Sequence, residues 1–272
     1  MFYTEKPFPG VSHISDAMGV CFTLIEGKER AILFDTGYGT ENVREYISTL
    51  TEKPVTVVLS HGHHDHVLGA RWFSRSMICA DDLEEFRMRT GTEQRNKVAV
   101  QAGQKSVPVP DDFLTAPIAD PLTLVFHEHL GPFEAEREDL GGREVMMIHV
   151  PGHTPGSIVL YVEDCGLLLT GDDWNPCTWM WFPSSAPVRE WRDNMKEIIS
   201  LIPKKTGGTI RHVLCSHQPA ARTAQELIDY LDYMTDRRIS TASPVEMGSA
   251  IHTCEIRMDP RGWTLVFDKD KA

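Results

Sequence analysis

The stretch His61-Gly62-His63-His64-Asp65-His66 places five side chains that can bind metal within six residues. It follows residues 55–60, a short apolar run rich in β-branched residues that is typical of a buried strand. Loops that leave strand ends are where open α/β proteins usually bind their ligands. Imidazole and carboxylate groups together suit zinc, iron or manganese. A solvated polar loop that happens to be rich in histidine is the alternative, and the rest of the chain decides between the two.

The order of residues within this loop separates its side chains. Residues two apart in an extended chain point the same way, so His61 and His63 can bind one ion while His64 points to the opposite side. Asp65 and His66 are neighbours and can share a second ion only where the chain bends. Residues 67–73 resemble the first turns of a helix, which would supply that bend. The loop therefore predicts two adjacent metal positions, with His64 outside both.

The composition is that of an ordinary globular protein with an acidic surface. The 272 residues are 41% hydrophobic and 24% charged, and 27 basic against 39 acidic residues give a formal charge of −12. No basic run stands out, so we expect a small-molecule substrate rather than nucleic acid or an anionic membrane. The N-terminus lacks the pattern of a signal peptide, and no apolar run approaches the roughly 18 residues of a membrane span. Six scattered cysteines without a C-x-x-C pair favour a reduced, cytoplasmic protein.

Strand-like and helix-like runs alternate through both halves of the chain, which predicts one α/β domain over residues 1–272. Strands are predicted at residues 20–26, 31–34, 55–60, 77–80, 145–150, 158–162, 167–170 and 212–215. Helices are predicted at residues 40–51, 188–202 and 224–234, and a capping box at residues 81–84 predicts another that ends near Arg89. The C-terminal residues 253–267 have the pattern of a β-hairpin.

The regular pattern weakens over residues 90–132, which contain five prolines. A long irregular stretch in a compact domain is usually a functional flap or a disordered insert. We favour a flap over the His loop. His127 and His129 lie within this stretch, and a solvated strand face explains them better than a metal pair.

Three further residues have the properties of metal ligands, and each follows a predicted strand. They are His153, Asp172 and His217, and all three lie beside small or rigid residues. Each alone could be an ordinary loop residue. Together with the His loop they form a set that chance rarely assembles.

These motifs resemble the metallo-β-lactamase-fold hydrolase superfamily, in its glyoxalase II-like or lactonase-like branch. The resemblance rests on His-x-His-x-Asp-His at 61–66, Pro-Gly-His-Thr-Pro-Gly at 151–156, Gly-Asp at 171–172, the late His217, and Leu-Phe-Asp-Thr-Gly at 33–37. It implies a four-layer αβ/βα sandwich. It also implies that His61, His63 and His153 hold a first metal, that Asp65, His66 and His217 hold a second, and that Asp172 bridges both. Asp35 would orient the metal loop from outside.

The resemblance further implies a dinuclear metal-dependent hydrolase with two divalent ions, zinc first, with iron or manganese as alternatives. Two such ions, two aspartates and a bridging hydroxide leave a net charge of about +1, which keeps the site Lewis acidic. We expect the bridging hydroxide to attack an ester, thioester or lactone carbonyl, and Asp65 to transfer the proton. Asp172 stands where many β-lactamases carry cysteine, which argues against antibiotic hydrolysis. A phosphodiesterase of the same fold and a mononuclear-iron persulfide dioxygenase-like oxidoreductase remain as alternatives.

An aromatic segment follows Asp172 and contains Trp174, Trp179, Trp181 and Phe182. Large apolar rings this close to a proposed ligand predict the wall of an apolar substrate pocket. Ordinary core packing or a homodimer contact is the alternative, because Trp is also enriched at interfaces.

Overall fold

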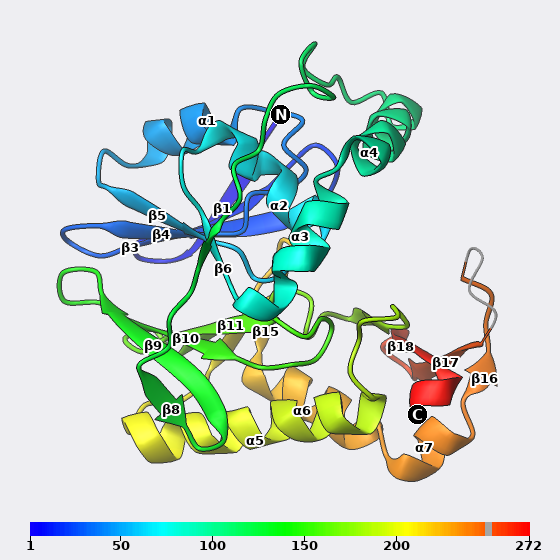
Figure 1. The fold of residues 1–272 in the computed structure, drawn as a ribbon. Coiled ribbons are helices and arrows are strands. Elements are labelled where there is room, and N and C mark those ends of the chain that lie inside the picture. Colours follow the sequence, from blue (N-terminus) through cyan, green and yellow to red (C-terminus); the bar gives the residue numbers. More distant parts are fainter. Residues whose placement is uncertain (248–251) are drawn as a thin grey trace. The chain divides into compact units, whose positions relative to one another are not determined.

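The computed structural model describes residues 1–247 and 252–272, and these form two compact units (Figure 1). The first unit comprises Met1–Val125, Arg137–Val145 and Ser216–Ala220. The second comprises Phe126–Glu136, Met146–Cys215 and Ala221–Ala272. Each unit combines β-sheet with helices. That residues 1–272 form a single domain stays a prediction.

The first unit is built on a seven-stranded sheet whose strands follow one another in sequence order. They are β1 (Tyr3–Phe8), β2 (Val11–Ser15), β3 (Cys21–Glu26), β4 (Ala31–Phe34), β5 (Val55–Val58), β6 (Met77–Ile78) and β7 (Leu122–Thr123). The first four strands pair antiparallel, whereas β4 and β5 are parallel, with Phe34 opposite Val58. Parallel strands end at the same edge of a sheet, so the residues that follow β4 and those that follow β5 emerge side by side.

The helices of the first unit are α1 (Val43–Leu50), α2 (His64–Val67), α3 (Leu83–Arg89), α4 (Thr92–Gln104) and the 3-10 turns η1 (Leu68–Trp72) and η2 (Ala80–Asp82). Helix α1 is capped by Asn42, whose side chain accepts a hydrogen bond from the Glu45 N–H group. Its buried face, Val43 and Ile47, packs against apolar side chains of the sheet. The sheet is therefore covered on this side by an amphipathic helix.

The segment predicted to be irregular, residues 90–132, contains the 13-residue helix α4. Its packing face has only two buried apolar side chains, Val98 and Ala102, which is why no hydrophobic periodicity reveals it. Both belong to a cluster with Tyr38, Leu68 and Phe113. The prediction of irregular structure is thus wrong for α4, while the proposed role as a flap stays a prediction.

The other two sheets belong mainly to the second unit. One has the order β15-β14-β12-β11-β10-β9-β8, with β8 (Glu128–Leu130), β9 (Phe133–Asp139), β10 (Glu144–His149), β11 (Ile158–Val162), β12 (Leu167–Leu169), β14 (His212–Leu214) and β15 (Arg222–Thr223). The other has the order β13-β18-β17-β16, with β13 (Cys177–Met180), β16 (Ser243–Pro244), β17 (Thr253–Met258) and β18 (Trp263–Asp268). Strands β17 and β18 pair antiparallel.

Helices α5 (Val188–Thr206) and α6 (Ala224–Tyr233) lie along one face of the larger of these sheets, and α7 (Asp236–Ser240) and η3 (Lys269–Lys271) lie near the smaller one (Figure 1). Trp191, Met195, Ile198 and Ile202 have helical spacing and are fully buried against the sheet. Among the described residues, no helix is both long enough and apolar enough to cross a membrane.

Candidate metal centre

The His loop connects β5 to α2, at the edge of the sheet where β4 also ends. Asp35 directly follows β4, so its side chain and the loop start from neighbouring strand ends. Helix α2 begins at His64, three residues before the position predicted from sequence. The bend needed by Asp65 and His66 is therefore made inside the His motif itself.

Asp35 is fully buried and accepts hydrogen bonds from both ends of the His loop. Its Oδ1 accepts from the Ser60 N–H group at 2.7 Å, and its Oδ2 accepts from Ser60 Oγ at 2.8 Å and from His66 Nδ1 at 2.9 Å. Because the Ser60 hydroxyl proton is given to Asp35, Ser60 Oγ accepts from His61 Nδ1, at 2.8 Å. Both His61 and His66 thus carry their proton on Nδ1, which makes Nε2 the ligand atom of each.

His63 faces an acidic side chain of α3. Its Nε2 lies 3.4 Å from Oε1 of Glu85, which also accepts a hydrogen bond from Arg89 Nε at 2.7 Å. The contact with His63, together with Arg89, lowers the pKa of Glu85 to about 2 in spite of its partial burial. With Nε2 turned toward Glu85, Nδ1 is the ring nitrogen that His63 can offer to a metal.

The glycine of the motif allows the loop to approach α3. A Cβ atom at Gly62 would lie 2.7 Å from the backbone nitrogen of Phe86. The Gly62 N–H group donates to Asp82 Oδ2 at 2.6 Å. The predicted capping box at 81–84 is therefore wrong, because the residue at the cap position of α3 is Asp82 rather than Asp81 and it makes no side-chain capping bond there. Its carboxylate accepts from the His loop instead. The predicted end of this helix near Arg89 is confirmed.

Asp65, His66 and His217 lie close together within the first unit. Oδ2 of Asp65 is 3.6 Å from Nε2 of His66 and 3.7 Å from Nε2 of His217. Two ligand atoms in tetrahedral coordination, with bonds near 2.1 Å, are separated by about 3.4 Å. The three side chains thus have the spacing that a single ion requires.

The second unit fixes His153 by its backbone and by its ring. The His153 N–H group donates to Asp173 Oδ1 at 2.7 Å, and the ring Nδ1 donates to the carbonyl oxygen of Trp179 at 2.6 Å. A carbonyl can only accept, so Nε2 is again the ligand atom. It lies 3.7 Å from Oδ2 of Asp172. A Cβ atom at Gly152 would lie 2.4 Å from Asp173 Oδ1, which accounts for the glycine before His153.

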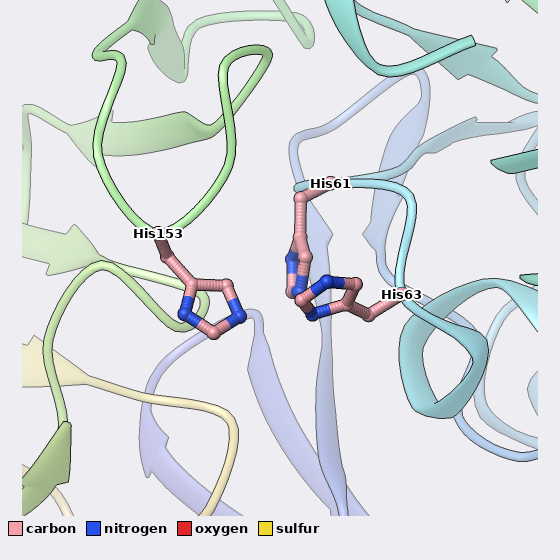
Figure 2. A group of neighbouring side chains, drawn as sticks. All are labelled: His61, His63 and His153. Atoms are coloured by element: carbon pink, nitrogen blue, oxygen red, sulfur yellow. The ribbon is translucent and has the colours of Figure 1, made fainter. Parts of the chain in front are cut away.

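All seven predicted ligands fall into two groups. In each group the potential ligand atoms lie within 4.8 Å of one another: one group is His61, His63 and His153, and the other is Asp65, His66, Asp172 and His217. Figure 2 shows the rings of the three histidines turned toward one another. The nitrogen and oxygen donors, their spacing and the fixed tautomers fit divalent metal ions.

His64 belongs to neither group, as its position in the motif predicts. Its ring packs edge-on against Tyr38 at 5.6 Å between centroids, and burial lowers its pKa. His127 and His129 are also outside both groups, and His127 instead contacts Glu136 through Nδ1 at 2.8 Å.

The aromatic residues after Asp172 separate into core and surface. The prediction that Trp174 lines a pocket is wrong, because its side chain is fully buried in the core and packs against Tyr230 and Trp263. Trp179 is 40% exposed, and Trp181 and Phe182 are partly buried. The ring of Phe182 lies 5.2 Å from that of His153.

A cavity of about 530 Å³ lies elsewhere in the first unit, lined by α1 and by the residues that precede β5, among them Arg44, Ile47 and Lys53. None of the predicted site residues lines it. It is therefore separate from the candidate metal centre.

Sequence reasoning missed the residues that hold the ligands in place, namely Ser60, Asp82, Glu85 and Asp173. Ser60 and Asp173 are next to predicted ligands, so their adjacency was a usable signal. Asp82 and Glu85 lie in a helix start 20 or more residues downstream, and the pattern there indicated only a cap.

The fold and these motifs place the chain in a family. Residues 19–205 match the model of the metallo-beta-lactamase superfamily, and the chain belongs to that superfamily. The predicted α/β class and metallo-β-lactamase fold are thereby confirmed. Membership of this superfamily supports a metal-dependent hydrolase in general. The cluster of histidine and aspartate side chains suggests divalent metal binding.

Among similar proteins is the human "Acyl-coenzyme A thioesterase MBLAC2", which is 24% identical over 213 residues, 71% of each chain. The "Probable metallo-hydrolase YqgX" of Bacillus subtilis (strain 168) is 27% identical over 148 residues, 53% of this chain and 61% of its own.

Two solved structures share the fold at low sequence identity. A metallo-beta-lactamase from Pontibacter korlensis has a TM-score of 0.55 at 16% identity, covering 85% of this chain and 98% of its own. The sec-alkylsulfatase Pisa1 from Pseudomonas sp. has a TM-score of 0.60 at 18% identity, and the match covers 84% of this chain but 40% of the sulfatase.

Proposed function

We propose that this protein is a dinuclear metal-dependent hydrolase that cleaves an ester, thioester or lactone bond of a small molecule. Membership of the superfamily and the two ligand groups support a hydrolase. The similarity to a human protein named as an acyl-coenzyme A thioesterase supports a carbonyl substrate, and a thioester first.

The proposed ligands of the first metal are His61, His63 and His153. Those of the second are Asp65, His66 and His217, with Asp172 shared by both. Zinc suits this set of imidazole and carboxylate donors, and iron or manganese are the alternatives.

The observation that carries the proposal is the buried carboxylate of Asp35. It receives hydrogen bonds from Ser60 and His66, and through Ser60 it also fixes the proton of His61. One histidine from each ligand group is thus held in the tautomer that exposes Nε2 to a metal. Histidines that bind metal are generally oriented by a hydrogen bond from the other ring nitrogen. A solvated loop that is only rich in histidine does not need its rings oriented by a buried carboxylate.

Divalent metals, when bound, polarise a substrate carbonyl and lower the pKa of water to about 7. The protein's own residues then orient the reaction. We assign proton transfer to Asp65, whose carboxylate lies beside His66 and His217. It would accept the proton that the attacking water gives up and pass it to the leaving oxygen or sulfur. His153, anchored by Trp179 and Asp173, would hold its Nε2 in place as a ligand of the first metal.

Metal analysis of protein purified without added metal, combined with a panel of ester, thioester, lactone and phosphodiester substrates, tests the proposal. We expect about two zinc ions per chain and turnover of a carbonyl substrate. One iron ion per chain, or turnover of phosphodiesters alone, would contradict it.

The variant Asp172→Ala tests the shared ligand. We expect it to lose metal at both positions and to lose activity, whereas Asp111→Ala, a change at an exposed aspartate outside both groups, should behave as the parent protein. An Asp172→Ala enzyme with unchanged metal content would refute the shared role.

A cytoplasmic location and a homodimer stay predictions.

A further inference from the structure

We propose that Trp179, Trp181 and Phe182, here called the aromatic row, bind a bulky apolar acyl group of the substrate, and that Lys271 positions this row. The inference deepens the proposed function, on which it rests, by naming the substrate class. All the contacts that carry it lie within the second unit.

The strand that begins the aromatic row also orients a proposed ligand. Strand β13 lies at the edge of its sheet and pairs only with β18 among the described strands of that sheet. Its side chains alternate, so that Thr178 and Met180 are buried while Trp179 is 40% exposed. The carbonyl oxygen of Trp179 accepts the hydrogen bond from His153 Nδ1. A shift of this strand would therefore move the exposed indole and the His153 ring together.

The rings of the row form a continuous series that ends at His153. The centroids of Trp179 and Trp181 are 6.0 Å apart, and Trp181 stacks on Phe182 at 4.5 Å with an interplanar angle of 23°. Phe182 meets the His153 ring edge-on at 5.2 Å. A substrate whose carbonyl carbon is held beside His153 would place its acyl substituent against these rings. Aromatic faces of this size favour long alkyl or aryl groups over acetyl.

Lys271 holds the turn that follows Phe182. Its Nζ donates to the carbonyl oxygens of Pro183 at 2.5 Å and Ser185 at 2.8 Å. On the other side of the same turn, Ser185 Oγ donates to the carbonyl oxygen of His153 at 2.8 Å. The turn is thus bound both to His153 and to the η3 segment, so the row has a fixed place relative to the proposed ligand.

The first test measures kcat/KM of the metal-loaded enzyme for a series of thioesters or esters from acetyl to decanoyl. For the parent protein we expect kcat/KM to rise about threefold to fourfold with each added methylene group that contacts the row. Trp181→Ala should lower the decanoyl-to-acetyl ratio at least tenfold, mainly through KM. Trp179→Ala serves as an independent second variant. Tyr3→Ala, which removes an exposed aromatic side chain of the first unit, should leave the ratio unchanged.

The second test isolates Lys271. Lys271→Met should lower the same ratio and raise KM for the decanoyl substrate, whereas Lys269→Met, a change in the same 3-10 turn, should do neither. A fall in kcat/KM that is equal for acetyl and decanoyl substrates in Lys271→Met would overturn the positioning role.

Direct binding of decanoate by calorimetry separates this inference from the proposed hydrolase activity, because it needs no turnover. Binding to the parent protein that is weakened at least tenfold in Trp181→Ala supports the aromatic row even if no substrate of the panel is hydrolysed. Equal binding by both proteins, no binding by either, or a change of molecular mass in Trp181→Ala, which would indicate a dimer contact, overturns it.

Discussion

Nε2 of His13 donates a hydrogen bond to the carbonyl oxygen of Gln218 at 3.0 Å, across 205 residues of sequence. His13 is buried on β2, and its Nδ1 accepts from Thr23 Oγ1 at 2.8 Å on the neighbouring strand. Burial lowers the pKa of His13, so the ring is neutral and both nitrogens have defined roles. Gln218 directly follows His217, and this bond therefore ties a proposed ligand to the sheet of the first unit.

His13→Ala should weaken the second metal position, because the loop that carries His217 loses its anchor. We expect a 10- to 100-fold loss of apparent affinity for one of the two metals, in the range typical of groups that support a ligand. His13→Gln keeps an N–H donor near Gln218 and should recover part of the lost metal affinity. Metal content after dialysis against buffered zinc measures the effect. Two metals bound as tightly as in the parent protein would show that His13 serves folding only.

Asp35→Asn should weaken both metal positions. The amide cannot accept all three hydrogen bonds that Asp35 receives from Ser60 and His66. Asp35 has a φ of 67°, a left-handed conformation that asparagine tolerates well, so backbone strain does not confound the comparison. Ser60→Ala is the comparison variant. It removes the partner of His61 and one hydrogen bond to Asp35 but leaves the bond between Asp35 and His66, so it should affect the first position more than the second. Competition with a chelator distinguishes the two variants, and an Asp35→Asn protein that retains both affinities would contradict this role.

Gly62→Ala should destabilise the fold, because the new methyl group would lie 2.7 Å from the Phe86 nitrogen. We expect the free energy of unfolding to fall by about 1–3 kcal/mol. The same change at Gly103, in α4, meets no atom within 4 Å and should instead raise it by about 0.5–1 kcal/mol. Urea denaturation of the two variants checks both signs, and equal effects would refute the packing argument.

Arg95→Met should loosen the segment after α4. Arg95 is buried and donates to the carbonyl oxygens of Thr90 at 2.7 Å and Ala116 at 2.6 Å. Leaving such groups unsatisfied costs about 1–3 kcal/mol. Limited proteolysis should therefore cut faster within residues 105–121. Lys97→Met, in the same helix, breaks only an exposed pair with Glu93 and should not change the cleavage rate.

Elements with strong hydrophobic patterns were predictable from the sequence. The strands at residues 31–34 and 158–162 have the predicted bounds, and α5 begins at the predicted Val188. Strands β1 and β13 and helix α4 were not predicted. Strand β1 has no fully buried residue, and α4 buries few apolar side chains, so neither carries a periodic signal. Their structure depends on partners distant in sequence.

The candidate ligands were predictable for two reasons. Few residue types bind metal ions, and the ligands follow predicted strands, where α/β proteins usually place their sites. The supporting contacts were not. Asp82 and Glu85 act on the His loop through the placement of α3, and His13 acts through a strand at the far end of the sequence. Trp174 was assigned to a pocket because a sequence does not show which tryptophan of a cluster faces the core.

The hydrogen bonds that Asp35 receives from Ser60 and His66 couple two ligand groups through one carboxylate. That carboxylate is fully buried and hydrogen-bonded within the folded chain, so His61 and His66 are oriented before an ion arrives. The conformational entropy lost in orienting them is therefore lost when the chain folds, not when metal binds. We expect metal uptake to leave the backbone of this loop where it is.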